Sequence, residues 1–341
     1  MLTKNLAVFM AVAATWVVDN GTASSQEIRS ARAPGAKAGV AAAAEEPSFT
    51  RKEDVVYGRK YGMALTMDVF TPQRAANGAA VIVVVSGGFV SSHNAINVPS
   101  VQAFIKRGYT VFAVVHGCQP RFQVPEIVED MKRSVRFIRH HARGYGIDSE
   151  RIGATGGSAG GHLSLMLGTA AEKGNSEAID PVDRESSHVQ AVACFFPPTD
   201  FLNFGATGVE KIHPMDYQFP FRASFDYRER DQKTNIWERI ADEDKLREIT
   251  RDISPIYFVN AQSAPTLIYH GDKDRLVPLQ QSQTFIDKLS GAGVEAKLVV
   301  KKGADHGWGK EMLTDLEAFA DWFDGHLKKP AASAQKTGGA R

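Results

Sequence analysis

The sequence predicts an α/β domain built on a mostly parallel β-sheet, with helices on both faces. Short apolar runs rich in valine alternate with segments of helical periodicity. Polar residues suited to catalysis follow directly after several of these runs, where parallel sheets bind their ligands. The chain has 341 residues, 43% hydrophobic and 23% charged, enough for one large domain or two small ones. The formal net charge of +1 gives no support for nucleic-acid binding.

The N-terminal residues of the sequence predict that the protein is exported from the cell. The apolar stretch 6–18 is too short for a lasting membrane anchor, and it follows Lys4 and precedes the small residues 21–24. This pattern predicts a signal peptide over 1–24; the alternative is a disordered apolar N-terminus. We therefore expect a secreted or periplasmic protein without an integral membrane anchor. Residues 25–49 are expected to be a flexible linker, 50–328 the catalytic domain, and 329–341 a disordered tail.

The first elements of the predicted domain are an antiparallel hairpin, because the second strand alternates and Lys60-Tyr61-Gly62 suits a turn. Valine-rich or otherwise apolar runs then predict strands buried on both faces. Helices are predicted where apolar residues recur on one face, with Gly144 expected just beyond the end of the second helix. The predicted strands are 54–58, 63–70, 79–85, 109–115, 189–196, 266–269 and 296–300, and the predicted helices are 101–107, 126–143, 278–289 and 311–327. The stretch 151–162 is predicted to be a short strand, a turn and the start of a further helix.

Residues 199–252 break this alternation and predict an insertion between strands six and seven of the sheet. The segment is dense in aromatic and charged residues, and 237–249 has helical spacing. We expect the insertion to form a lid or cap over the active site; the alternative is a structural excursion at the rim.

Ser158 is the candidate nucleophile. It stands in Gly156-x-Ser158-x-Gly160, between a predicted strand and a predicted helix, as in a nucleophile elbow. A side chain at either glycine would collide with the neighbouring strand or helix in so sharp a turn. The following helix would offer free N–H groups to a developing negative charge. The alternative is an ordinary glycine-rich turn.

Asp274 and His306 are the candidate partners of Ser158. A serine hydroxyl needs a base, and that base needs an anion to set its tautomer. Both residues follow predicted strands, and His306 lies in a glycine-flanked loop. We expect Asp272 to cap its own turn and Asp305 to point away from the His306 ring.

The remaining predictions concern the walls of the site. The backbone N–H of Ala159 and a second donor from Gly88 or Phe89, beside Gly87, are expected to form an oxyanion hole. His116 and Trp308 are candidate substrate contacts, whereas His162 is expected to be structural. No metal-ligand spacing and no dinucleotide-binding motif occurs, so neither metal nor cofactor is expected. Cys118 and Cys194 are expected on strands separated by two others, about 14 Å apart, and therefore as free thiols.

The elbow and its partners resemble those of α/β-hydrolase carboxylesterases. The group they are most similar to is the BD-FAE-like esterases, bacterial feruloyl and acetyl-xylan esterase relatives, near the hormone-sensitive-lipase type. One departure is Ser86-Gly87-Gly88-Phe89, where these esterases usually carry H-G-G-G; the segment 115–120 is also altered. The resemblance covers about 54–327 and rests on Gly146-Ile147-Asp148, Gly156 to Leu163, His270-Gly271-Asp272-x-Asp274-x-x-Val277-Pro278 and Asp305-His306-Gly307.

The resemblance implies an exported serine carboxylesterase acting on small-molecule or oligosaccharide esters, with acetyl or feruloyl groups on carbohydrate as the implied substrates. Two alternatives remain. A prolyl-oligopeptidase-type peptidase shares the Ser-Asp-His order, although residues 25–49 leave no room for the β-propeller usual in that group. A catalytically inactive binding protein on a hydrolase scaffold is the other.

Overall fold

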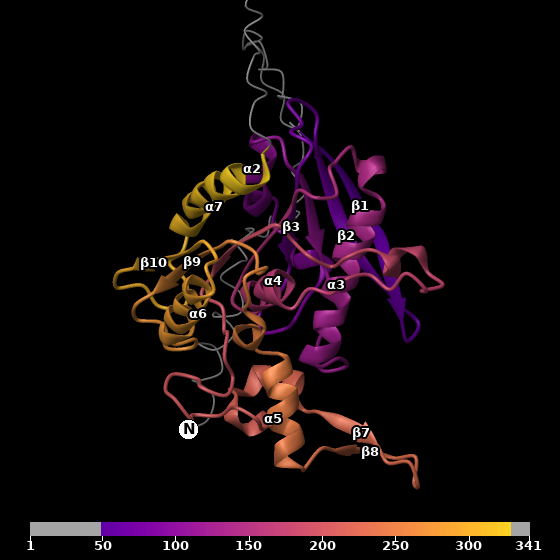
Figure 1. Cartoon of the computed structure of the whole chain (residues 1–341), viewed down its shortest axis with the longest axis vertical. Helices are drawn as coiled ribbons and strands as arrows, with labels where there is room; N and C mark the ends of the chain where they lie inside the picture. Colours follow the sequence, from indigo (N-terminus) through magenta and orange to yellow (C-terminus); the bar gives the residue numbers. More distant parts are fainter. Residues whose placement is uncertain (1–48, 329–341) are drawn as a thin grey trace, which may run out of the picture.

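An eight-stranded sheet runs through the domain, in the order β1-β2-β4-β3-β5-β6-β9-β10 (Figure 1). The protein is described here from a computed structural model, which describes residues 49–328. Strand β2 runs antiparallel to β1 and to β4, and all other neighbours in this sheet are parallel. The strands are β1 Phe49–Lys60, β2 Met63–Pro72, β3 Ala80–Val84, β4 Thr110–Val114, β5 Ile152–Gly157, β6 Ala191–Phe195, β9 Thr266–Gly271 and β10 Ala296–Lys301.

The sheet divides the core into two layers of helices. One face is covered by α2 (Val98–Lys106) and α7 (Glu311–Leu327), whose buried side chains join one apolar cluster. The other face is covered by α3 (Val124–His140), α4 (Ala159–Thr169) and α6 (Gln280–Gly291). Strands β3 to β6 are buried at every position, because helices lie on both sides of them. The predicted mostly parallel sheet with helices on both faces is confirmed.

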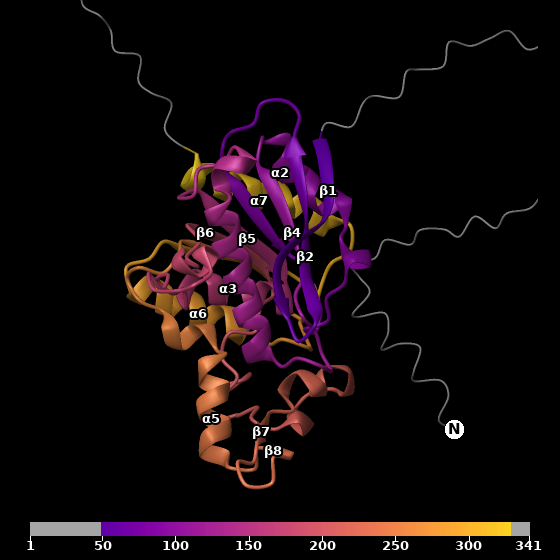
Figure 2. The same ribbon diagram turned by 90° about the vertical axis from the view of Figure 1, so that its right-hand side faces the viewer.

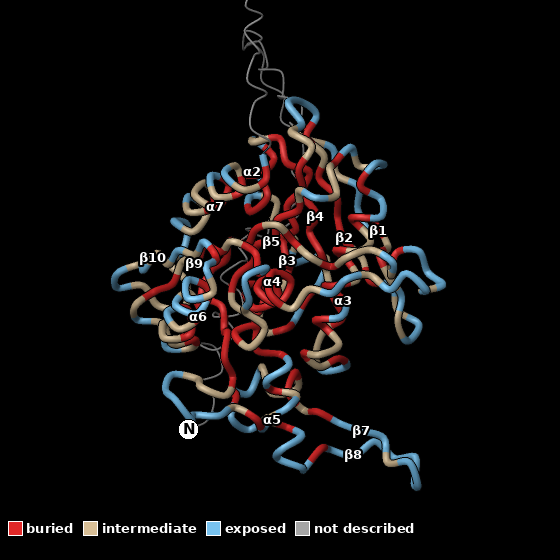
Figure 3. Tube along the Cα trace, in the orientation of Figure 1, coloured by how far each residue is buried: buried red, intermediate tan, exposed pale blue. Residues whose placement is uncertain are grey.

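Helix α4 is buried along its whole length, as Figure 3 shows. Its sequence is apolar or small all round, which suits a helix enclosed by the sheet and by other helices. The residue that precedes it is Ser158, so the candidate nucleophile stands at the edge of the most enclosed element of the fold.

The segment 199–252 connects β6 to β9, the sixth and seventh strands of the sheet along the chain, as predicted. Figures 1 and 2 show its helix α5 and its β7–β8 hairpin at one end of the domain, beyond the sheet. Its elements are the 3₁₀ turns η4 Pro214–Asp216 and η5 Phe219–Phe225, the strands β7 Arg228–Arg230 and β8 Trp237–Arg239, and helix α5 Glu243–Asp252.

The helix predicted over 237–249 begins later than expected. Asp242 ends the preceding segment and caps α5, because its carboxylate accepts the N–H groups of Asp244 and Lys245. Trp237 lies on strand β8, and its side chain is 62% exposed. It is therefore not part of the buried face of a helix, as the helical spacing had suggested.

The ends of helix α3 and of the first hairpin also differ from the prediction. Helix α3 stops at His140 and a 3₁₀ turn, Ala142–Tyr145, follows it. The left-handed residue after that turn is Gly146, with φ 66°, rather than Gly144. The predicted hairpin is longer than expected, because β1 begins at Phe49.

Cys118 and Cys194 are free thiols, as predicted. Cys194 lies on β6, whereas Cys118 follows β4 rather than lying on it, and β3 and β5 separate the two strands. Within residues 49–328, no helix combines the length and the apolar character needed to cross a bilayer. The predicted signal peptide and C-terminal tail, and all but the last residue of the predicted linker, lie outside the described residues.

Candidate active site

Ser158 occupies a strained turn between β5 and α4. Its φ of 54° and ψ of −120° are unusual for a residue with a side chain. A Cβ on Gly156 would lie 2.6 Å from the carbonyl carbon of Gly160, and one on Gly160 would lie 2.8 Å from the carbonyl oxygen of Val84. The predicted steric reason for both glycines is confirmed. The tight turn holds the serine at the carboxyl end of β5.

Ser158, His306 and Asp274 form a continuous hydrogen-bonded chain. Ser158 Oγ lies 2.9 Å from His306 Nε2, and His306 Nδ1 lies 2.7 Å from Asp274 Oδ2. Because an ionised carboxylate can only accept, Nδ1 carries the ring proton and donates it. Nε2 is then free to accept the serine proton, which is the arrangement required of a general base.

Asp274 is fixed on both sides of its carboxylate. Oδ1 accepts the N–H groups of Leu276 and Val277 at 2.9 and 2.8 Å, and His270 Nε2 lies 3.3 Å from Oδ2. Burial would raise the pKa of Asp274, but the bonds from His270 and His306 outweigh burial and hold the pKa well below its usual range. Asp274 therefore stays ionised opposite His306.

The other two acidic residues of these loops have structural contacts. Asp272 does not close its own turn as predicted; its Oδ1 accepts the N–H of Gly303 at 2.6 Å, and Asp274 closes the turn instead. Asp305 is directed away from the His306 ring, as predicted. Its carboxylate accepts the backbone N–H of Arg275 at 3.0 Å and pairs with the Arg275 guanidinium. These bonds join the loop after β9 to the loop after β10.

The His306 ring rests on aromatic side chains. The Phe196 ring centroid lies 4.4 Å from that of His306, and Trp308 packs edge-on against Phe196 at 5.6 Å. Trp308 also donates Nε1–H to Asp315 at 2.6 Å. Trp308, predicted as a substrate contact, therefore packs behind Phe196 and supports His306 through that ring.

The segment 87–90 places two backbone N–H groups beside the nucleophile. Gly87 and Val90 exchange reciprocal N–H···O bonds of 3.0 Å, so the N–H of Gly87 already has an acceptor. Gly88 and Phe89 lie between them with φ of 56° and 62°, and neither N–H has an acceptor among residues 49–328. Both residues line one pocket together with Ser158 and Ala159, whose N–H begins α4 and has no intrahelical acceptor.

His116 lies close to this segment but not in the pocket. It is 3% exposed, Nδ1 donates to the Gly117 carbonyl at 2.6 Å, and Nε2 accepts from Ser86 Oγ at 2.8 Å. Burial lowers the pKa of His116 to about 4, so the ring is neutral at pH 7. The structure does not place His116 among the residues that line the cavities, in contrast to its predicted substrate contact. Its role is to hold Ser86, which stands where the resemblance expects histidine.

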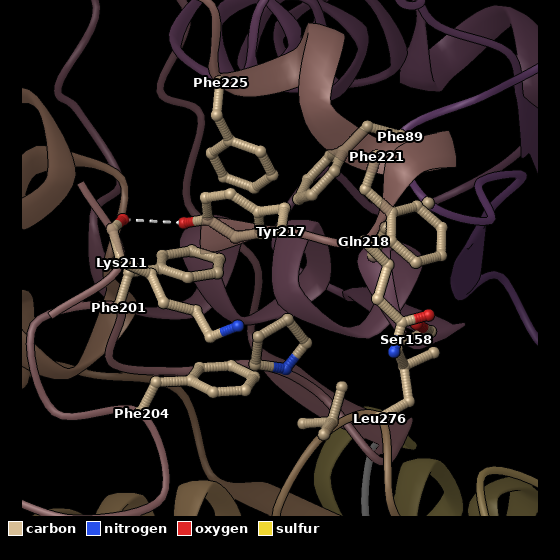
Figure 4. Close-up of a pocket in the computed structure, with 14 residues that line it drawn as sticks. Phe89, Ser158, Phe201, Phe204, Lys211, Tyr217, Gln218, Phe221, Phe225 and Leu276 are labelled. Carbon is tan, nitrogen blue, oxygen red and sulfur yellow. Dashed lines mark hydrogen bonds between the residues drawn. The ribbon is translucent and has the colours of Figure 1, made fainter. Parts of the chain in front are cut away.

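The pocket beside Ser158 is open on one side, and aromatic side chains form much of its wall (Figure 4). A second, larger cavity borders the end of β3 and shares Gly88 and Phe221 with the first. The Phe221 ring lies against Gly88 so closely that a Cβ there would be 2.3 Å from it. Half of the first pocket comes from the insertion, namely Phe201, Phe204, Lys211, Tyr217, Gln218, Phe221 and Phe225.

This chain belongs to the BD-FAE family. The family model for BD-FAE matches residues 67–289, which include the elbow and Asp274. Two relatives from Mycobacterium tuberculosis (strain ATCC 25618 / H37Rv) are similar to it. Esterase LipQ is 29% identical over 245 residues, 70% of this chain and 53% of LipQ. Probable carboxylic ester hydrolase LipM is 29% identical over 246 residues, 71% of this chain and 52% of LipM. The chain thus spans about half the length of these curated relatives.

Solved structures place the BD-FAE chain in the α/β-hydrolase fold. A truncated form of a carbohydrate esterase from gut microbiota has a TM-score of 0.65 at 24% identity, covering 83% of this chain and 99% of that one. An acetyl ester-xyloside bifunctional hydrolase from Caldicellulosiruptor lactoaceticus has a TM-score of 0.62 at 20% identity, covering 80% and 95%. At these identities the likeness establishes the fold alone.

His162 connects the elbow of this BD-FAE protein to its insertion, in the structural role predicted for it. The side chain is fully buried, and Nε2 donates to the carbonyl of Ile253 at 2.6 Å. Its ring packs edge-on against Phe89 and Phe201 at 5.4 and 5.5 Å. Burial lowers the pKa of His162 to about 4, although the bond to Ile253 opposes this.

One group of possible metal ligands occurs away from the active site in the described part of the chain. Glu53, Asp68 and His93 place one ligand atom each within 4.8 Å of one another. The Arg51 guanidinium already lies against Asp68 at 2.5 Å and against Glu53 at 3.3 Å. The two carboxylates of this group are therefore already paired with an arginine.

Sequence reasoning missed the pocket-lining residues of the insertion and the contact made by Gln119. Gln119 Nε2 donates to the carbonyls of Gly88 and Pro220 at 2.8 and 2.7 Å, which joins the 87–90 segment to the insertion. The high aromatic content of 199–252 was a signal that this segment forms an apolar wall. It carried no information on which rings meet, because those contacts depend on the packing of turns without periodicity.

Proposed function

We propose that this protein is a serine carboxylesterase that acts through an acyl-enzyme. The observation that carries the proposal is the hydrogen-bonded chain from Ser158 through His306 to Asp274, which opens on a pocket lined by free N–H groups. Ser158 Oγ attacks the ester carbonyl carbon while His306 Nε2 takes the hydroxyl proton. His306 then gives that proton to the leaving alcohol as the C–O bond breaks. Water attacks the acyl-enzyme in the same way and releases the acid.

The negative charge that develops on the carbonyl oxygen needs donors in fixed positions. We assign this role to the N–H of Ala159 and to the N–H of Gly88 or Phe89, since all three residues line the pocket with Ser158. Gly87 is left out because its N–H bonds to Val90. Loss of one such donor typically costs about 2.7–4 kcal/mol of transition-state stabilisation.

For the substrate, we propose short acyl or feruloyl and acetyl esters of carbohydrates. Among the similar proteins, LipQ is an esterase and LipM a probable carboxylic ester hydrolase, and two structural neighbours are a carbohydrate esterase and an acetyl ester-xyloside bifunctional hydrolase. The aromatic walls suit an apolar or flat group, and two cavities that meet at Gly88 suit the two halves of an ester.

Two further features are part of this proposal. Export rests on the pattern of residues 1–24, and it would bring the enzyme to carbohydrate outside the cell. A moving lid rests on the position of the insertion, which supplies half of the pocket lining and carries the exposed β7–β8 hairpin.

The test is hydrolysis of p-nitrophenyl acetate, butyrate and octanoate by the protein and by its Ser158→Ala and His306→Ala variants. We expect each variant to lose several powers of ten in kcat, because the two side chains act as one unit. The trend with acyl length then measures the acyl pocket. Turnover that persists in both variants would contradict the proposal, and so would absence of turnover together with cleavage of peptide substrates.

A further inference from the structure

Lys211 directs its ammonium group into the pocket beside Ser158. Nζ lies 4.5 Å from the ring centroid of Phe204 and 5.2 Å from that of Tyr217. Figure 4 shows the nitrogen between aromatic rings on the side of the pocket opposite Ser158. Tyr217 in turn donates its hydroxyl to the Lys211 carbonyl at 2.8 Å, so both ends of the lysine are held. A long cationic side chain usually extends its charge into water, so this inward position is informative.

The ammonium group has few partners. It donates one hydrogen bond, of 2.9 Å, to the carbonyl of Asp216, although an ammonium carries three donors. Within residues 49–328 no carboxylate forms an ion pair with it; the Asp216 carboxylate accepts the His213 N–H at 2.7 Å. Burial lowers the pKa of Lys211, and the charge of Asp216 only partly opposes this. The group is thus a half-buried cation with unused donors.

The aromatic contacts explain how the lysine is held but not why donors remain free. A cation over an aromatic face gains about 0.5–2 kcal/mol, which suffices to orient the side chain. An ammonium donates and never accepts, so its missing partner must be an acceptor. An anionic oxygen is favoured over a neutral one because a charge-assisted hydrogen bond is shorter and stronger than a neutral one.

We propose that Lys211 recognises an anionic oxygen, a carboxylate, on the ester substrate and so determines specificity. The inference rests on the proposed esterase function and adds the chemical class of the substrate. The carbon skeleton of the substrate would lie between Phe204 and Phe221, with the ester at Ser158 and the carboxylate at Lys211. Neutral esters remain substrates, because the triad does not contact Lys211, but they gain nothing from the ammonium.

The experiment compares esters that differ only in one charge. For the acyl half, the pair is the p-nitrophenyl monoester of adipic acid and its methyl-capped neutral form. For the alcohol half, the pair is 4-acetoxybenzoate and its methyl ester. Each is assayed with the wild type, Lys211→Met and Lys211→Arg. The matched control is Lys233→Met, which changes an exposed lysine in the turn between β7 and β8.

We expect the wild type to prefer the charged member of one pair by about tenfold in kcat/KM, carried mainly by KM. Lys211→Met should abolish this preference, with a clearly larger loss of kcat/KM for the charged ester than for the neutral one. Lys211→Arg should retain part of the preference, Lys233→Met all of it, and added salt should reduce it. Equal rates for both members of both pairs in the wild type would overturn the proposal, and so would an equal loss for charged and neutral esters in Lys211→Met.

A binding measurement separates this proposal from the proposed function. Monomethyl adipate and 4-hydroxybenzoate are titrated calorimetrically into Ser158→Ala and into Ser158→Ala with Lys211→Met. Weaker binding in the second protein by about tenfold supports recognition by Lys211 even if no ester is turned over. Equal affinity in the two proteins refutes it even if the esterase activity is real.

Discussion

The two sides of the pocket are held by different forces. On the catalytic side, hydrogen bonds lock the loops: Asp274 accepts two backbone N–H groups and Asp305 pairs with Arg275. On the insertion side, rings pack against rings, as where Tyr217 stacks on Phe225 with centroids 3.6 Å apart. Hydrogen bonds weaken steeply when their angles change, whereas aromatic pairs tolerate several arrangements.

Because of this difference, we expect the two sides of the pocket to control different properties: the rate of the reaction and the choice of ester. A shift of 1 Å in His306 would break its bonds to Ser158 and Asp274, so the catalytic side permits little change. The insertion side can exchange one ring for another and still exclude water. We therefore expect substitutions on the catalytic side to lower turnover of all esters, and those on the insertion side to change which esters are preferred.

The largest effect should come from Asp274, one of two acids in the loop after β9. Asp274→Asn should lower kcat for p-nitrophenyl butyrate by about 10⁴, because an amide can donate to Nδ1 and stabilise the wrong tautomer of His306. Asp272→Asn is the matched control two residues away, and its Oδ1 can still accept from Gly303. A similar loss in both variants would show that Asp274 and Asp272 do not differ in their roles.

A second effect concerns the junction between the two sides, at His162. Its pKa is lowered to about 4 in the folded protein, against about 6.5 in the unfolded chain. The unfolded chain therefore binds more protons between these values, so folded stability is complete above pH 6.5 and falls as the pH drops toward 4. Between pH 7 and 5 this one group should cost on the order of 2 kcal/mol of unfolding free energy.

Urea unfolding of the wild type and of His162→Gln at pH 7 and pH 5 measures this effect. The variant should lose less unfolding free energy on acidification than the wild type, whatever its stability at pH 7. His116, whose pKa is also lowered to about 4, keeps part of the dependence in both proteins. An identical loss in the two proteins would contradict the role of His162.

The smallest effect should come from Phe221, which separates the two cavities. Phe221→Ala should join them and improve kcat/KM for octanoate relative to acetate by several-fold, about 1 kcal/mol, with kcat for acetate retained. The control is Trp237→Ser, since Trp237 is exposed on the β7–β8 hairpin. An unchanged chain-length profile in Phe221→Ala would show that Phe221 does not divide the substrate.

The local sequence was sufficient to predict the elements that position the catalytic side. Gly156 and Gly160 marked the elbow because the collisions they avoid lie within a few residues or with an adjacent strand. His306 and Asp274 stood directly after predicted strands, and parallel strands bring such positions to one edge. The prediction that Asp272 caps its own turn was wrong, because both acids suit a turn and only the folded backbone decides which one accepts the N–H groups of Leu276 and Val277.

Local patterns in the sequence were thus enough to predict most strands and helices along the chain, the elbow and the three residues that meet there. Burial periodicity and steric limits act over short stretches of chain, so these features can be recognised locally. Tertiary structure alone decided the rest: that His116 holds Ser86, that Trp308 supports His306 through Phe196, and that Lys211 faces the pocket. These contacts join residues whose neighbours in sequence carry no periodic pattern. Their partners are chosen by the packing of the whole domain, which a local pattern does not encode.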